Sequence, residues 1–290
     1  MNAYDRLMAL QFPLVEHHYG PRDVILYALG VGYGADPLDT AQLDFTIETR
    51  LKVAPTMAVV LAYPGFWYRD LDTGLDFQKV VHGSESVTLD RPLPAEATVV
   101  AQNRVVDIID KGPGKGALVT SRREIFDKSS GARLATVTQT AFCRGNGGIG
   151  GQPGAAPPPH PLPGREADLT CTLPTQPQAA LIYRLSGDPN PLHYDPDFAR
   201  AAGYPRPILH GLATHGVVGH ALLRSACDYD AARLTSMECR FSAPVFPGDA
   251  VRTEIWRDGA VLSFRAFVGE RLVINNGRAT VADYTGSPLG

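Results

Sequence analysis

The chain has few cysteines, no marked excess of either charge and no long apolar run. Only four of its 290 residues are cysteine, and no two of them form a Cys-x-x-Cys pair. A disulfide framework or a cysteine zinc site is therefore not expected. The 27 basic and 30 acidic side chains give a formal charge of −3. A nucleic-acid partner is not expected either, because phosphate binding needs a concentrated basic face.

Signals for membranes and cofactors are also missing. No apolar run approaches the roughly 18 residues that span a bilayer. The first residues do not resemble a signal peptide, and the last three are not Ser-Lys-Leu, so we expect a cytoplasmic protein without a membrane partner. No dinucleotide or P-loop glycine motif occurs in the required context. His210, His215 and His220 recur every five residues and do not share a helical face, so we predict neither a metal nor an organic cofactor.

What is present indicates a globular protein in two halves. Apolar residues make up 44% of the chain, enough for a packed core. A segment rich in glycine and then proline lies near the middle. We predict an N-terminal domain at 1–144, a linker at 145–165 and a C-terminal domain at 166–290.

Both halves show the same order of patterns, helices first and antiparallel strands after them. A helix that is apolar nearly all round is a buried helix, and alternation of apolar and polar residues indicates strands. The sequence therefore predicts an α+β double hot-dog, in which each half wraps an antiparallel sheet around a central helix. The expected helices are 22–30, 55–65, 195–202 and 212–224, and the expected strands are 98–109, 117–127, 132–142, 235–243, 251–257, 261–268 and 272–284.

One loop carries a carboxylate and an imidazole close together. Asp188 and His193 flank two prolines, Pro189 and Pro191, which exclude an ordinary helix and hold the loop rigid. Such a pair can hold a water molecule, one group taking a proton while the other supplies one. The alternative is a plain turn in which the aspartate caps a backbone amide and the histidine faces solvent.

Gly211 opens a second candidate site at the start of the helix expected at 212–224. The first amides of a helix lack partners and lie at the positive end of its dipole. A glycine there lets a ligand approach the backbone, so a thioester oxygen could be polarised as in an oxyanion hole. An ordinary helix start is the alternative.

Residues 183–216 resemble the hydratase 2 motif of the MaoC-like dehydratases, (R)-specific 2-enoyl-CoA hydratases of the hot-dog superfamily. The motif reads Tyr-x-Leu-Ser-Gly-Asp-x-Asn-Pro-Leu-His-x-Asp-Pro, then Pro-Ile-Leu-His-Gly-Leu-x-Thr-x-Gly. Segments of the first half, such as Arg91-Pro92-Leu93-Pro94, resemble the two-domain members of the family. In those members only the C-terminal hot-dog is catalytic, and the N-terminal one accommodates the acyl chain.

The resemblance implies a role for individual residues. Asp188 and His193 would activate water, Asn190 would orient it, and the Gly211 amide would bind the thioester oxygen. Four further positions would contact the acyl-CoA, and for two of them a purely structural role stays open, His82 as a structural histidine and Phe241 as a core residue. The four contacts are His82, Gly83, Lys111 and Phe241.

The expected function is reversible hydration of trans-2-enoyl-CoA to (3R)-3-hydroxyacyl-CoA by a monomeric double hot-dog or a homodimer. A dehydratase of the same family that acts on branched, steroid-derived or carrier-protein-linked thioesters is an alternative, as is a non-catalytic acyl-CoA-binding subunit. A hot-dog thioesterase ranks lower, because the helix at 212–224 contains no carboxylate.

Overall fold

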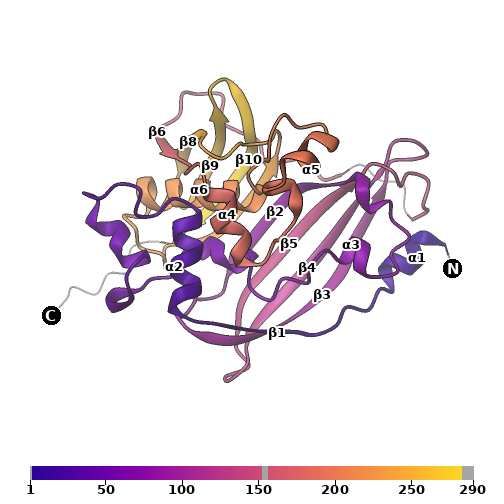
Figure 1. The fold of residues 1–290 in the computed structure, drawn as a ribbon, viewed down its shortest axis with the longest axis horizontal. Coiled ribbons are helices and arrows are strands. Elements are labelled where there is room, and N and C mark those ends of the chain that lie inside the picture. The colour runs from indigo at the N-terminus through magenta and orange to yellow at the C-terminus, as the bar shows by residue number, and fades with distance from the viewer. Residues whose placement is uncertain (1, 152–155, 283–290) are drawn as a thin grey trace.

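The computed structural model describes residues 2–151 and 156–282. Ten strands form one antiparallel sheet in the order β1-β3-β4-β5-β2-β7-β10-β9-β8-β6, so the first five strands of the chain occupy one half and the last five the other (Figure 1). The strands are β1 (Val15–Tyr19), β2 (Val80–Leu89), β3 (Ala97–Asp110), β4 (Ala117–Asp127), β5 (Arg133–Cys143), β6 (Leu169–Pro174), β7 (Leu234–Phe241), β8 (Ala250–Asp258), β9 (Val261–Val268) and β10 (Arg271–Val281).

The helices are mostly short. The α-helices are α1 (Ala3–Met8), α2 (Pro21–Gly30), α3 (Trp67–Asp70), α4 (Ala179–Tyr183), α5 (Pro196–Ala201) and α6 (Gly211–Ala226). The 3₁₀ turns are η1 (Thr40–Phe45), η2 (Glu48–Arg50), η3 (Pro55–Val59), η4 (Phe77–Lys79), η5 (Arg184–Ser186) and η6 (Pro191–His193). Only α6 among these elements is long, and its burial makes it the centre of the C-terminal half.

The α+β double hot-dog predicted from the sequence is confirmed. All seven expected strands are present within a few residues of their predicted ends, and β4 and β5 form the expected hairpin. Strands β3 and β4 alternate between buried and more exposed residues along most of their length. β1, β2 and β6 were not expected. β2 in particular carries polar residues from Ser84 to Ser86 and lacks the apolar alternation of a surface strand.

Helix α6 is buried along most of its length and packs against β6, β7, β8 and η3. Two of its glycines permit this close packing. A Cβ on Gly219 would lie 2.5 Å from Thr56 of η3, and one on Gly216 would lie 2.5 Å from Val31 after α2. The backbone of α6 therefore comes close to the N-terminal half at these two positions, and the His220 ring stacks on Tyr33 of that half with centroids 3.8 Å apart.

The helix expected at 55–65 is wrong in extent and type. The segment forms only the 3₁₀ turn η3, and its backbone leaves helical geometry at Ala62, where φ is +47°. The β-branched residues Thr56, Val59 and Val60 disfavour an α-helix, and Pro64 disfavours helical geometry at the residue before it. Its apolar character reflects burial, because residues 55–62 are all buried between α6 and the sheet.

Strands β2 and β7 join the two halves. They pair antiparallel, with Ser84 opposite Arg240 and Thr88 opposite Ser236. The halves therefore share one hydrogen-bonded sheet and one large core that draws residues from both.

The domain boundaries at 144 and 166 stay a prediction, and residues 152–155 of the expected linker lie outside the described residues. The last expected strand, 272–284, also extends beyond them, as does the C-terminal tripeptide used to predict location. In the described part of the chain, no helix combines the length and the apolar character needed to cross a membrane.

Three buried histidines predict that the fold loses stability in acid. Burial lowers the pKa of His210 and of His215 to about 3 and that of His220 to about 4. An unfolded histidine titrates near about 6.5, so below that pH the unfolded chain binds more protons than the folded one. We expect the free energy of unfolding to fall by about 1–2 kcal/mol per histidine between about pH 7 and about pH 5, measured by urea denaturation.

His215 gives the sharpest version of this test, since neither ring nitrogen has a hydrogen-bond partner among the described residues. His215→Met should remove one histidine's share of the acid loss. His18→Gln, at an exposed position on β1, should not. An acid slope that is the same in His215→Met and in the unmutated protein contradicts the assignment.

Candidate active site

The loop from Asp188 to Asp195 is held by its own polar side chains. The Asn190 side-chain oxygen accepts the Leu192 amide at 3.0 Å and so caps η6, the turn that carries His193. The backbone amide of Asn190 in turn donates to Asp188 Oδ1 at 3.2 Å. Asn190 thus fixes Asp188 and His193 relative to each other, and its role in orienting water stays a prediction.

His193 has a defined proton position. Its Nδ1 lies 2.9 Å from the Ile208 carbonyl oxygen. A carbonyl only accepts, so Nδ1 carries the hydrogen and Nε2 keeps its lone pair when the ring is neutral. Burial lowers the pKa of His193, opposed by the Asp188 charge and by the Ile208 carbonyl. The ring is therefore a neutral base at neutral pH.

His210 completes the cluster, although the sequence singled it out only to reject it as a metal ligand. Its ring stacks on that of His193 with centroids 3.6 Å apart, and its Nε2 donates to the Asp188 backbone oxygen at 3.1 Å. Its Nδ1 is buried and has no hydrogen-bond partner among the residues that the structure describes. The pKa falls to about 3 because of burial and then the nearby His193. One feature of the sequence could have indicated that His210 belongs to the site, namely its position directly before Gly211.

One ligand atom from each of Asp188, His193 and His210 lies within 4.8 Å of the other two. A carboxylate and two imidazole nitrogens at this spacing can hold a water molecule by hydrogen bonds. The same set of donors suits a divalent cation. The sequence analysis tested His210 as a metal ligand only together with His215 and His220, whereas in the fold it lies with Asp188 and His193. The expected absence of a metal therefore stays a prediction.

Gly211 lies at the first position of α6, where no side chain caps the helix. In the part of the chain described here its amide has no hydrogen-bond acceptor. The Phe241 ring packs against Gly211, where a Cβ would lie 3.5 Å from the ring. The amide is thus a free donor at the positive end of a long helix.

The first-half residues reach this site from β2. The His82 ring lies edge-on to that of Phe241, with centroids 4.5 Å apart. His82 Nε2 donates to the buried Glu85 carboxylate at 2.8 Å. The Gln139 side chain lies 3.3 Å from His82 Nδ1. Both ring nitrogens are therefore engaged within the protein, and the ring face is what His82 offers a ligand.

Gly83 and Lys111 are less closely tied to the cluster. Gly83 lies at an irregularity in the β2–β5 pairing, where a Cβ would approach the Thr140 carbonyl oxygen at 3.0 Å. Lys111 follows β3, and its ammonium lies 4.9 Å from the centre of the Phe142 ring. No contact recorded within residues 2–151 and 156–282 joins Lys111 to Asp188 or His193, so its contact with acyl-CoA stays a prediction.

Known proteins share both halves of this arrangement. The profile of the MaoC like domain matches residues 159–277, and that of the MFE-2 hydratase 2 N-terminal domain matches 17–145. The 3-hydroxyacyl-thioester dehydratase Y of Mycobacterium tuberculosis is 44% identical over 81% of each chain. This chain belongs to the MaoC-like dehydratase family.

Further similarities extend over nearly the whole of this MaoC-like chain. The peroxisomal enoyl-CoA hydratase 2 of Arabidopsis thaliana is 34% identical, with 92% of this chain and 91% of the relative covered. The crystal structure of a MaoC-like dehydratase from Phytophthora capsici superposes with a TM-score of 0.84 at 30% identity, covering 96% of this chain and 98% of the other. The similarity therefore includes the fold of both halves.

Because Asp188 and His193 lie on the same loop, we predict that they act together on one water molecule. Asp188→Asn keeps the shape of the side chain but removes its basic site, and His193→Gln keeps hydrogen bonding without a titratable group. Each should lower kcat for trans-2-enoyl-CoA hydration at least about a hundredfold. The double variant should lose far less than the product of the two.

A matched control is Asp197→Asn, an exposed carboxylate paired with Arg200 on α5; it should keep normal turnover. Near-normal kcat in either single variant, or fully multiplicative losses in the double variant, would contradict a shared role.

The lowered pKa of His193 predicts a pH profile. Protonation removes the Nε2 lone pair, so kcat/KM should fall with acid at an apparent pKa below about 6.5. A crotonyl pantetheine thioester is the suitable substrate, because it carries no phosphate titrating near about pH 6. The residual activity of His193→Gln should lack this acid limb. An acid limb at or above the ordinary histidine value would rule out a neutral buried base.

Proposed function

We propose that the protein catalyses the reversible hydration of trans-2-enoyl-CoA to (3R)-3-hydroxyacyl-CoA. The observation that carries the proposal is the grouping of the Asp188 carboxylate with a ring nitrogen of the neutral His193 within 4.8 Å. The His193 ring stacks on His210, the residue directly before the Gly211 amide at the start of α6. The names of the relatives, an enoyl-CoA hydratase and a 3-hydroxyacyl-thioester dehydratase, support a hydro-lyase.

The proposed reaction uses one water molecule and no net proton. The pair removes a proton from the water, and the resulting hydroxide adds to C3. Electrons move from the C2–C3 double bond to the thioester oxygen, where the Gly211 amide stabilises the negative charge. The enolate then collapses, and C2 takes a proton from the pair. Because one loop supplies both groups, hydrogen and hydroxyl add to the same face.

In this proposal the N-terminal half binds substrate without performing chemistry. It contains no Asp-x₄-His loop before a helix. Lys111 carries an ammonium suited to the phosphates of coenzyme A, and the ring of His82 packs against Phe241 beside Gly211. A non-catalytic acyl-CoA-binding subunit fits less well, because such a protein has no need of a neutral base beside a carboxylate.

Assembly and location remain predictions from the sequence. A monomeric double hot-dog is supported by the continuous ten-stranded sheet, since β2 and β7 of one chain already provide the junction between the halves. A homodimer is compatible with the same sheet. The cytoplasmic location likewise remains a prediction.

Chiral analysis of the product tests the proposal directly. With trans-2-enoyl-CoA thioesters of increasing length, we expect exclusively the (3R)-hydroxyacyl-CoA, and activity that is unchanged after treatment with a chelator. An exclusively (3S) product would overturn the proposed geometry. Loss of activity on chelation, restored by a divalent cation, would instead assign Asp188, His193 and His210 to a metal site.

A further inference from the structure

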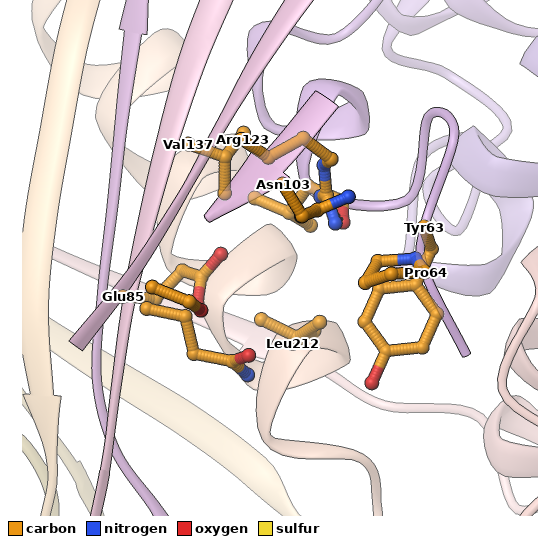
Figure 2. Close-up of a pocket in the computed structure, with 10 residues that line it drawn as sticks. Tyr63, Pro64, Glu85, Asn103, Arg123, Val137 and Leu212 are labelled. Carbon is orange, nitrogen blue, oxygen red and sulfur yellow. Dashed lines mark hydrogen bonds between the residues drawn. The ribbon is translucent and has the colours of Figure 1, made fainter. Parts of the chain in front are cut away.

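A small pocket of about 10 Å³ lies between the sheet of the N-terminal half and the start of α6, where Leu212 follows Gly211 (Figure 2). One water molecule needs about 10–15 Å³ of such space, together with two to four polar partners. An acyl chain is far too large for this pocket. The space therefore suits a single molecule of the size of water.

One wall of the pocket carries a buried guanidinium without an ionic partner. Arg123 on β4 is only 5% exposed, and its Nη2 donates to the Val59 carbonyl oxygen at 2.5 Å. No ion pair in residues 2–151 and 156–282 joins it to a carboxylate, and its Nε has no hydrogen-bond acceptor there. Buried arginines normally pair with carboxylates or fill their hydrogen bonds. The Arg123 Nε is therefore a donor that lacks an acceptor within the described protein.

A second donor of this kind lies beside the first. Asn103 on β3 is directly opposite Arg123 in the sheet register and is also 5% exposed. Its side-chain Nδ2 is buried without an acceptor among the described residues. Figure 2 shows the nitrogen ends of Asn103 and Arg123 close together at the pocket. Two neighbouring donors without acceptors form a site for a ligand oxygen.

The Glu85 carboxylate of β2 lies across the pocket from these donors (Figure 2). Its Oε2 accepts from His82 Nε2 at 2.8 Å, which leaves Oε1 for another donor. Burial lowers the pKa of Arg123, and the Glu85 charge opposes this lowering, so the two charges act on each other without forming an ion pair. Each is tied elsewhere, Arg123 to Val59 and Glu85 to His82, and a gap remains between them.

The charges around the pocket select a neutral occupant. Glu85 would repel an anion such as chloride, and the Arg123 guanidinium would repel a metal cation. Water is neutral, accepts two hydrogen bonds and donates two. It can accept from Arg123 Nε and Asn103 Nδ2 and donate to Glu85 Oε1. The side chain of Gln139, which also lines the pocket, offers a fourth partner.

We infer that one water molecule is bound in this pocket by Arg123, Asn103 and Glu85, and that it holds Glu85 in the position that orients His82. Arg123 and Asn103 are thereby positioning residues for the His82 ring, which packs against Phe241. The part of the inference that concerns His82 rests on the proposed function, in which this ring contacts acyl-CoA. The water site itself does not depend on that function.

The water separates two opposite charges in a part of the protein that screens them poorly. Without it, Arg123 and Glu85 attract each other directly. A carboxylate that turns toward Arg123 gives up its bond to His82, so the His82 ring loses the acceptor that fixes it. The expected result is weaker binding of acyl-CoA and an unchanged chemical step.

A crystal structure at a resolution that shows ordered water tests the site directly. We expect one water oxygen within about 2.7–3.2 Å of Arg123 Nε, Asn103 Nδ2 and Glu85 Oε1. A direct ion pair between Arg123 and Glu85, an empty pocket, or an ion in place of the water would overturn the inference.

Asn103→Leu tests the positioning role, because it removes one donor and fills space beside the water. Its crystal structure should show Glu85 paired with Arg123 and no water between them. KM for crotonyl-CoA should rise about two- to tenfold, the effect of losing one hydrogen bond, with little change in kcat. Gln102→Leu is the matched control, an exposed amide on the same strand, and should keep both the water and the KM.

Asn103→Ser retains a hydroxyl donor and should raise KM less than Asn103→Leu does. Equal KM values in these two variants, or loss of the water without a rise in KM, would contradict the positioning role. If Asn103→Leu does not fold, the crystal structure of the unmutated protein still decides the water site.

Failure of this inference is distinguishable from failure of the proposed function. If the unmutated protein does not hydrate crotonyl-CoA, the proposed function is wrong, and the crystal structure alone decides whether the water is bound. If crotonyl-CoA is hydrated but the pocket contains no water, the proposed function stands and the inference is wrong.

Discussion

The antiparallel pairing of β2 with β7 is the interaction on which the rest of the molecule depends. It converts two five-stranded halves into one sheet and places His82 of β2 against Phe241 at the end of β7. Phe241 in turn packs on Gly211 at the start of α6. The junction therefore connects the interior of the N-terminal half with the helix terminus of the C-terminal half. Neither half alone has both a free helix amide and the polar pocket next to it.

Burial is the main cause of the lowered histidine pKa values at the site. His193 and His210 are held neutral by desolvation, and each donates its one hydrogen to a backbone carbonyl, those of Ile208 and Asp188. Backbone carbonyls are fixed by the fold, so they determine which ring nitrogen keeps its lone pair more reliably than a mobile side chain could. The cost is acid sensitivity, because the same burial that keeps a base neutral favours the unfolded chain once protons are abundant.

Much of this architecture could be predicted from the sequence, because the informative patterns were local. Alternation identified the long strands, and the prolines around Asn190 identified the loop. β2 could not be found in this way, since its central residues are polar and it becomes a strand through pairing on both sides. The stacking of His210 on His193 is likewise tertiary. Arg123 did leave a signal: it is in phase with the buried Val119, Ser121 and Ile125, on the face that alternation assigns to the interior.

The unpartnered donors also bear on how the two halves divide the work. Leaving a buried donor without an acceptor costs about 1–3 kcal/mol, which a fold with one large core tolerates at a few places. Several such groups exist in the described chain, but Arg123 and Asn103 differ in facing each other across paired strands and lining a pocket. Both residues lie on strands of the N-terminal half, β3 and β4, whereas the proposed catalytic residues Asp188 and His193 lie on a loop of the C-terminal half. A polar contact made by Arg123 or Asn103 would therefore be separate from the proposed acid–base pair.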